Sequence, residues 1–385
     1  MKYKFAALLG AATLMLPAVA GAQAARTQSG TINGLTYTAQ SLIIGQTSTA
    51  TIAGGGDPIY QAPKPQYSGV VALIMRYANG NAFICSGSLM ADRRTVLTAG
   101  HCVSDGSSAR PMSTTAYFYG GPNGDTVVPG SPDATPVTVA NYFVNPKYTG
   151  EVIDQNDIAV LQLTTQAPDF ATAYDLYTAG DLTGRAFNIA GYGRRSDTGG
   201  SIGANLGTGR LRQGDNRFEF ALGEPEFNGF FTDVDPTTGK NFFGKAEIGY
   251  SYVSDFDNGL AKNDAACLVA AGVGGTSGRF CDVGVGAREV GVSGGDSGGP
   301  QFIDGKLASV TSYGLSFGQN FGDFTTMLDS SFGELNGFVP IFIHTDFIAG
   351  AVAAVPEPAT WALMIMGFGL VGTAARRSRK PALAA

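Results

Sequence analysis

The sequence predicts an all-β protein, and two observations support this fold class. Gly and Pro are frequent, with 55 and 18 residues among 385, and they divide the chain into short segments. Between these turn residues lie short apolar or alternating runs rich in Val, Thr, Tyr and Phe, which are typical of strands in barrels and sandwiches. The clearest runs span residues 69–76, 83–90, 95–98 and 158–163.

The composition limits the classes of partner. The apolar content of 44 % is sufficient for a large core in one or two packed units. Charged residues make up only 15 % of the chain, the formal net charge is -6, and the body of the chain contains no basic run. A phosphate-rich ligand would find no obvious docking surface, so we expect no nucleic-acid partner.

Residues 1–22 have the composition of a secretory signal peptide. Lys2 and Lys4 precede an apolar stretch that begins at Phe5, and a small residue stands at Ala22. A buried first helix is the alternative interpretation. We expect cleavage after Ala22 by signal peptidase and export of the mature chain.

Cysteine usage agrees with an exported protein. An even number of cysteines outside the cytoplasm favours disulfides over a metal site, and the spacings match no zinc pattern. The four cysteines are Cys85, Cys102, Cys267 and Cys281.

Two segments lack the regular strand pattern. Residues 23–65 are rich in Gly, Thr, Ser and Gln without a long periodic pattern that requires a packed core, and we interpret them as a pro-region or an extended arm. Residues 212–253 are rich in Phe, Gly and Asp and contain the turn-like sequence Asp235-Pro-Thr-Thr-Gly239. We expect this second segment to be an insertion of hairpins.

The C-terminal residues 351–385 contain a proline motif, an apolar run from Ala362 to Ala375, and a basic cluster. The run is shorter than the roughly 20 residues of a comfortable membrane span. Basic residues at its end nevertheless favour retention of that end on the cytoplasmic side of a membrane. A C-terminal core helix is the alternative.

This tail resembles the PEP-CTERM sorting signal of Gram-negative bacteria. The resemblance rests on Pro356-Glu-Pro358, Trp361-Ala362, Gly367-Phe-Gly-Leu370 and the arginines that follow. It implies transient insertion into the inner membrane, recognition by an exosortase, removal of the tail, and delivery to the cell surface or an extracellular matrix.

Acyl transfer from a serine hydroxyl requires a base within hydrogen-bond reach and a third group that orients the base. The chain has only two histidines, His101 and His344. His101 follows the apolar pair Val96-Leu97 and precedes Cys102, so a disulfide there would restrict its position, as a general base requires. A structural histidine is the alternative when His101 is considered alone.

A serine lies within the glycine-rich sequence Gly294-Gly-Asp-Ser-Gly-Gly-Pro300. Glycines permit backbone conformations that bring N–H groups to one point, as stabilisation of an oxyanion requires. Ser297 is the candidate nucleophile, and the N–H groups of Gly295 and Ser297 are the candidate oxyanion hole. An incidental serine in a glycine-rich turn is the alternative, but the motif around His101 in the same chain favours catalysis.

The third group must be a buried acid that accepts a hydrogen bond from the imidazole. Asp157 opens the run Asp157-Ile-Ala-Val-Leu161 and leads directly into an apolar strand. An aspartate at a strand start is more often a turn residue. Its place in the order His101, Asp157, Ser297 favours the catalytic role.

Together these motifs resemble those of the trypsin/chymotrypsin family of serine proteases. The resemblance implies two six-stranded antiparallel β-barrels with the triad at their junction, a short C-terminal helix, and bridges Cys85–Cys102 and Cys267–Cys281. The matching segments are Cys85-Ser-Gly-Ser-Leu-Met90, Leu97-Thr-Ala-Gly-His-Cys102, Asp157-Ile-Ala-Val-Leu161, Gly191-Tyr-Gly193, Gly295-Asp-Ser-Gly-Gly-Pro300 and Ser312-Tyr-Gly314.

On this basis we expect a peptidase domain over residues 66–350, with a first barrel over about 66–172 and a second, containing the hairpins, over about 173–350. The implied function is a secreted serine endopeptidase that hydrolyses protein or peptide substrates through an acyl-enzyme on Ser297, without a cofactor or metal. A non-catalytic surface or matrix binding module on the same fold is the alternative, which the complete set of His, Asp and Ser disfavours.

The resemblance also implies a specificity pocket with Gly291 at its floor, six positions before Ser297, and Ser312, Tyr313 and Gly314 in its wall. Because position 291 is not acidic, we expect an apolar or small residue before the scissile bond. The alternative is a carboxylate that enters the pocket from residues 316–337.

In the family, a new N-terminal amine often pairs with the aspartate before the nucleophile, here Asp296. Ile52-Ala-Gly-Gly55 faintly resembles such an N-terminus, and a flexible linker is the alternative, which we favour.

Three further groups receive a structural interpretation. His344 lies among apolar residues, so a structural role is expected. Two acidic groups could donate oxygens to calcium, but neither has a complete loop spacing, so turns are favoured. These groups are Asp255, Asp257 and Asn258, and Asp233 and Asp235.

Overall fold

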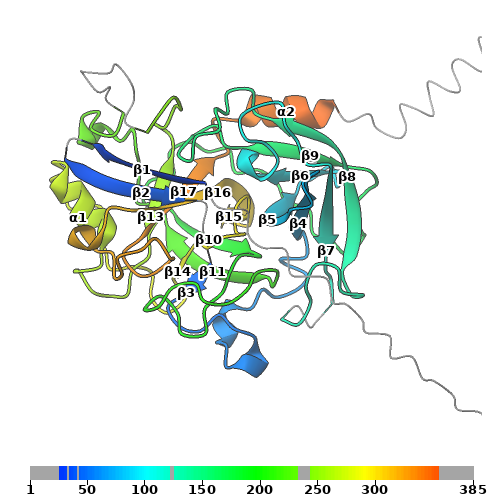
Figure 1. Ribbon diagram of the computed structural model, residues 1–385, viewed down its shortest axis with the longest axis horizontal. Coiled ribbons are helices and arrows are strands. Elements are labelled where there is room, and N and C mark those ends of the chain that lie inside the picture. Colours follow the sequence, from blue (N-terminus) through cyan, green and yellow to red (C-terminus); the bar gives the residue numbers. More distant parts are fainter. Residues whose placement is uncertain (1–25, 33, 41–42, 122–124, 233–242, 355–385) are drawn as a thin grey trace, which may run out of the picture.

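The computed structural model describes residues 26–354, apart from 33, 41–42, 122–124 and 233–242. The chain is mostly strand over these residues, as predicted, and the described part contains two α-helices, α1 (Ala265–Gly272) and α2 (Thr345–Ala353). Figure 1 shows two β-units next to each other, with α2 along the first unit and α1 at the far side of the second. The expected signal peptide (1–22) and residues 355–385 of the sorting segment lie outside the described residues.

The first unit is a closed antiparallel barrel of six strands, in the order β4-β5-β6-β9-β8-β7. Alternation along β4 divides its side chains, because Val71 and Leu73 enter the barrel core while Val70 and Ala72 face the second unit. The strands are β4 (Val70–Arg76), β5 (Ala82–Leu89), β6 (Thr95–Thr98), β7 (Ser113–Phe118), β8 (Thr135–Val144) and β9 (Ala159–Leu163).

Strands of the second unit follow the order β11-β10-β15-β16-β17-β13-β12. The two ends of this path, β11 and β12, are separated in the chain only by Phe218 and Glu219, so the sheet must curl back toward itself. The strands are β10 (Ala186–Gly191), β11 (Arg212–Arg217), β12 (Phe220–Ala221), β13 (Tyr252–Asp255), β15 (Pro300–Ile303), β16 (Lys306–Ser316) and β17 (Leu335–Pro340).

A second closed six-stranded barrel is not confirmed. No strand ladder joins β11 to β12 in the described residues, so the second unit is a half-barrel by its hydrogen bonds. The short C-terminal helix that we expected is present as α2.

The predicted insertion of hairpins at residues 212–253 is not confirmed either. The segment begins with β11 and ends within β13, which are strands of the sheet itself. Between them, residues 222–232 and 243–251 contain one short 3-10 helix (Pro225–Phe227) and no strand. Buried phenylalanines in this segment, including Phe227 and Phe231, pack against α1, so aromatic burial rather than strand pairing explains the composition.

The N-terminal arm joins the second unit. Strands β1 (Thr27–Ile32) and β2 (Leu35–Gln40) form a hairpin, and β2 extends the sheet along β16 (Figure 1). A further short strand, β3 (Ile44–Gly45), pairs with β14 (Val290–Gly291). The strands of this arm were not predicted, because its threonines and glycines carry no continuous apolar pattern.

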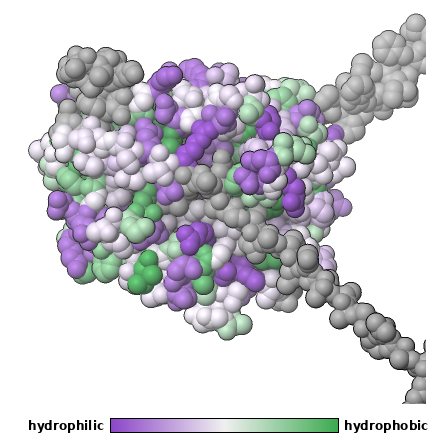
Figure 2. Space-filling view, viewed as in Figure 1, coloured by the Kyte–Doolittle hydropathy of each residue, from purple (hydrophilic) through white to green (hydrophobic). Residues whose placement is uncertain are grey.

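An apolar cluster joins the two units. It contains Val70 and Val160 from the first barrel together with Phe302 and Val310 from the second sheet, and Ile348 of α2 covers it. The catalytic candidates lie beside this junction. On the face shown in Figure 2, hydrophilic and hydrophobic residues are interspersed, which agrees with burial of most large apolar side chains inside.

Both expected disulfides are present. Cys85–Cys102 connects β5 to the turn that carries His101, and Cys267–Cys281 connects α1 to the loop before β14. In the described part of the chain, every helix is too short or too polar to cross a bilayer.

Candidate active site

The structure brings His101 and Asp157 together as predicted. His101 lies in a 3-10 turn (Gly100–Cys102) at the end of β6, and Asp157 lies just before β9, the neighbouring strand. The His101 Nδ1 atom is 2.7 Å from Asp157 Oδ2, and the backbone N–H of His101 donates to Asp157 Oδ1 at 2.7 Å. Two contacts to one carboxylate therefore fix both the backbone and the ring of His101.

This pairing determines which ring nitrogen is available for chemistry. An ionised carboxylate only accepts hydrogen bonds, so the Nδ1 atom of His101 carries the proton in the neutral ring. The Nε2 atom is then an acceptor, and it is buried without a hydrogen-bond partner among the described residues. The ring has the tautomer that a general base requires.

Asp157 is held by its own surroundings. The Ser312 hydroxyl donates to Asp157 Oδ2 at 2.6 Å, and the Asp157 side chain is almost completely buried. Asp154 shapes the preceding turn, since its carboxylate accepts from the N–H groups of Thr149 and Asn156. Burial raises the pKa of Asp154 to about 6. Ser312 was predicted to line the specificity pocket, and its contact with Asp157 could not be inferred from sequence spacing.

The loop that carries Ser297 is fastened to the first barrel by Ser86 of β5. The Ser86 N–H donates to the carbonyl oxygen of Ser297 at 2.8 Å, and its hydroxyl donates to the carbonyl oxygen of Gly295 at 2.9 Å. Gly298 permits this approach, because a Cβ atom there would lie 2.0 Å from Thr98 Oγ1. Sequence reasoning placed Ser86 in a family motif without giving it this role.

Ser297 therefore lies against the strand end that carries His101. Its carbonyl oxygen is also 3.6 Å from Cys102 Sγ. His101 Nε2 has no hydrogen-bond partner among the described residues, so Ser297 Oγ is not hydrogen-bonded to it in this structure.

The expected oxyanion donors have the required freedom. Within the described part of the chain, neither the N–H of Gly295 nor that of Ser297 donates to a protein acceptor. Gly295 has a φ of 105°, a conformation that a side chain would disfavour. Both donors are thus free to bind an external oxygen.

The Asp296 side chain also holds the loop that carries Ser297. Its carboxylate is buried and accepts from the N–H groups of Gly193 and Ser293 at 2.8 and 2.9 Å. A Cβ atom at Gly191 or Gly193 would lie 2.3 or 2.4 Å from a carboxylate oxygen, which explains the Gly-Tyr-Gly sequence. Burial raises the pKa of Asp296 well above its ordinary value, and no ion pair with Asp296 occurs among the described residues.

The candidate pocket residues have different environments. Gly291 packs against the ring of Phe256, where a Cβ atom would approach to 2.9 Å. The Tyr313 side chain is fully buried and hydrogen bonds Ser251 at 2.7 Å, and the residue pairs with Gly337 of β17. Gly314 pairs with Gln40 of β2.

A comparison with protein families agrees with these motifs. Residues 59–217 match the family model described as Trypsin. This resemblance supports a serine protease with an all-β, chymotrypsin-like fold. The trypsin-like match ends at β11, so the Ser297 loop lies beyond it. No curated protein matches the chain.

A second family model, the PEP-CTERM protein-sorting motif, matches residues 354–380. It points to export in Gram-negative bacteria with processing by an exosortase. The match begins at the residue after α2 ends.

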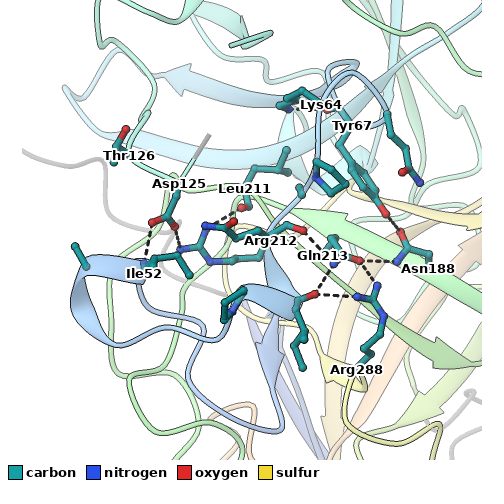
Figure 3. Close-up of a pocket in the computed structure, with 17 residues that line it drawn as sticks. Ile52, Lys64, Tyr67, Asp125, Thr126, Asn188, Leu211, Arg212, Gln213 and Arg288 are labelled. Carbon is teal, nitrogen blue, oxygen red and sulfur yellow. Dashed lines mark hydrogen bonds and ion pairs between the residues drawn. The ribbon is translucent and has the colours of Figure 1, made fainter. Parts of the chain in front are cut away.

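A cavity of about 1160 Å³ lies apart from the triad candidates, between the arm and the second sheet (Figure 3). Asp125 pairs with Arg212 at 2.6 Å on one side of it, and Arg288 pairs with Asp215 at 2.6 Å on the other. Burial lowers the pKa of Lys64, which also lines it, to about 7. None of the three predicted catalytic residues lines this cavity.

His344 has the contacts of a structural residue. Its Nε2–H donates to the carbonyl oxygen of Gln155 at 2.8 Å, and its Nδ1 accepts from Asn145 Nδ2 at 3.1 Å. The ring is therefore held neutral, and burial lowers its pKa below the usual 6.5.

These contacts predict an acid-sensitive fold. Below about pH 6.5 the unfolded chain binds a proton at His344 that the folded chain resists. The free energy of unfolding therefore decreases as the pH is lowered. We expect His344→Gln to show a shallower decrease between pH 7 and 5 in urea unfolding. An equal decrease in both proteins would contradict the prediction.

Proposed function

We propose that this chain is a secreted serine endopeptidase that forms an acyl-enzyme on Ser297. The observation that carries the proposal is the 2.7 Å contact between His101 and Asp157, which leaves Nε2 buried without a partner among the described residues, while the neighbouring Cys102 Sγ lies 3.6 Å from the Ser297 carbonyl oxygen. A site of this composition has a base, an orienting acid and a nucleophile within one junction.

In the proposed reaction, His101 Nε2 removes the proton from Ser297 Oγ as the oxygen attacks the substrate carbonyl. The N–H groups of Gly295 and Ser297 stabilise the negative oxygen of the tetrahedral intermediate. Asp157 stabilises the imidazolium that forms, and the imidazolium then protonates the leaving amine. Water completes the cycle by the same steps and releases the acyl group.

A non-catalytic binding module on the same fold is the competing function. It would have no need for an unpartnered ring nitrogen and two free N–H groups at the same place, because buried polar groups without partners are costly. These features favour the enzyme.

A fluorophosphonate probe tests the nucleophile, since it labels only activated serines. We expect the mature protein to be labelled and Ser297→Ala to abolish the label. Ser88→Ala is the control, because Ser88 is likewise a buried serine and its hydroxyl has no partner among the described residues. Absence of label on the mature wild-type protein would favour the binding module.

The proposed preference is for an apolar or small residue before the scissile bond. The later pocket wall contains three carboxylates, and two of them accept hydrogen bonds from their own loop: Asp323 from Thr325 N–H at 2.9 Å, and Glu334 from Asp329 N–H at 2.7 Å. The third, Asp329, has its Oδ1 buried without a partner among the described residues, and its Oδ2 accepts from the Thr325 hydroxyl at 3.2 Å. The apolar preference therefore rests on Gly291, and Asp329 is the carboxylate through which a basic preference would act.

Peptides that differ only at this position test the preference. We expect kcat/KM for Leu to exceed that for Arg by about tenfold or more, because an arginine would bury a charge without a partner. A preference for Arg or Lys would refute the assignment.

We also propose that the arm is a pro-region and that maturation exposes Ile43 rather than Ile52. Ile52 is 41 % exposed and its backbone N–H donates to Asp125, away from Asp296. By contrast, Ile43 and Ile44 are buried, and Ile44 pairs with Gly291, five residues before Asp296. An amine at Ile43 would supply a cation to buried Asp296, which forms no ion pair with the described residues.

The preceding strand supports the same proposal. Residues Thr38 to Gln40 of β2 pair with Ser316 to Gly314, which occupies one hydrogen-bonding edge of the predicted pocket wall. Cleavage after Leu42 would release this strand, and leucine agrees with the proposed apolar preference.

N-terminal sequencing of active protein tests this maturation, with Ile43 expected as the first residue. Cleavage at a protease site engineered before Ile52 should leave activity low, because that amine lies beside Asp125. Full activity of a chain that retains residues 23–42 would contradict the proposal.

The proposed function also includes a route of export. A signal peptide at residues 1–22 directs the chain out of the cytoplasm, and the chain is then held in the membrane before delivery to the cell surface or matrix. The sorting-motif match supports the exosortase step of this route.

A further inference from the structure

Three aspartates converge behind the segment that leads to Gly291. Asp255 ends β13, Asp257 follows two residues later, and Asp264 is the N-cap residue of α1. Each is at most 2 % exposed, and one carboxylate oxygen from each lies within 4.8 Å of the others. Such proximity of buried acids requires compensation.

The Asp257 side chain is buried without a hydrogen-bond donor. The residue is only 1 % exposed, and neither of its carboxylate oxygens accepts a hydrogen bond from the residues that the structure describes. The other two acids each receive one donor from the first turn of α1, since Ala266 N–H donates to Asp255 and Cys267 N–H donates to Asp264, both at 2.8 Å. Asp257 thus projects an unsatisfied carboxylate toward two others.

No basic side chain of the described residues pairs with these aspartates. None of the three aspartates forms an ion pair among the described residues. The adjacent acid, Glu289, accepts from the N–H groups of Asp257 and Val285 at 2.5 and 2.6 Å, and burial raises its pKa to about 8. Desolvated charges in this arrangement are strongly destabilising without a partner.

The connecting loop is already ordered by its own contacts. Asn263 Nδ2 donates to the carbonyl oxygen of Gly322 at 2.6 Å, and Asn258 Nδ2 donates to Asn263 Oδ1 at 2.9 Å. Gln46 of the arm donates to the carbonyl oxygen of Asp257. These bonds hold the three carboxylates near one another without using the Asp257 side chain.

We propose that Asp255, Asp257 and Asp264 bind a calcium ion. Calcium prefers carboxylate oxygens and tolerates irregular coordination geometry, whereas magnesium demands near-ideal octahedral geometry and retains its waters. The sequence favoured turns here because the spacing fits no complete loop; the fold supplies the third carboxylate from the helix cap.

The site adjoins the predicted specificity pocket. Phe256, between two of the ligands, packs against Gly291, and Glu289 precedes Gly291 by two residues. Bound calcium would therefore stiffen the base of this pocket, although its binding does not depend on the proposed catalysis.

Calorimetric titration of the chelator-treated, exported protein with calcium chloride tests the proposal. We expect one calcium ion per chain and a higher melting temperature with calcium. Asp257→Asn should weaken binding by roughly tenfold or more, because a neutral amide replaces a ligand charge. This variant should fold, since it removes an unpaired buried charge.

Asp323→Asn is the matched control, because Asp323 is buried but its oxygens accept from Ser316 and Thr325. Its calcium affinity should equal that of the wild type. The proposal is overturned if millimolar calcium gives neither heat nor a shift in melting temperature. Equal affinity in Asp257→Asn, or equal affinity for magnesium, would overturn it as well.

Discussion

The site depends on the contact between Ser86 and the loop at residues 295–297. Two hydrogen bonds from one serine in the first barrel hold two carbonyl groups of the second unit, across more than 200 positions of sequence. Two neighbouring features are required by this contact or reinforce it. Gly298 must lack a side chain to allow it, and the disulfide at Cys102 holds the neighbouring turn against the same carbonyl oxygen.

Buried carboxylates organise the molecule around this junction, and each is compensated differently. Asp157 accepts from a ring nitrogen, a backbone N–H and a hydroxyl. Asp296 accepts from two backbone N–H groups, and Asp257 accepts no hydrogen bond from the described residues. Asp157 therefore has three donors, whereas neither Asp296 nor Asp257 forms an ion pair within the described part of the chain. Buried carboxylates without a hydrogen-bond donor or a counter-ion are candidate sites for binding an external cation.

The sequence predicted the local motifs better than their assembly. The contact between His101 and Asp157 and both disulfides were predictable because short motifs with fixed chemistry surround these residues. The open second sheet was not predictable. Whether β11 and β12 pair depends on the curvature of the sheet, which no local sequence pattern encodes. The arm was interpreted as lacking a core, but Ile43 and Ile44 are buried by partners in β14 that are distant in sequence. Ser312 was placed in the pocket, and its bond to Asp157 required the structure.

The pairing of β2 with β16 determines how easily another strand can replace β2 at this edge. Because β2 belongs to the same chain, its effective concentration at the β16 edge is set by the length of the connecting segment and not by the amount of protein. Dilution into a large extracellular volume would leave that edge occupied. A competing peptide must displace β2, which is tethered to the same chain. Only cleavage of the polypeptide between β2 and the rest of the chain would make the loss of β2 from this edge permanent.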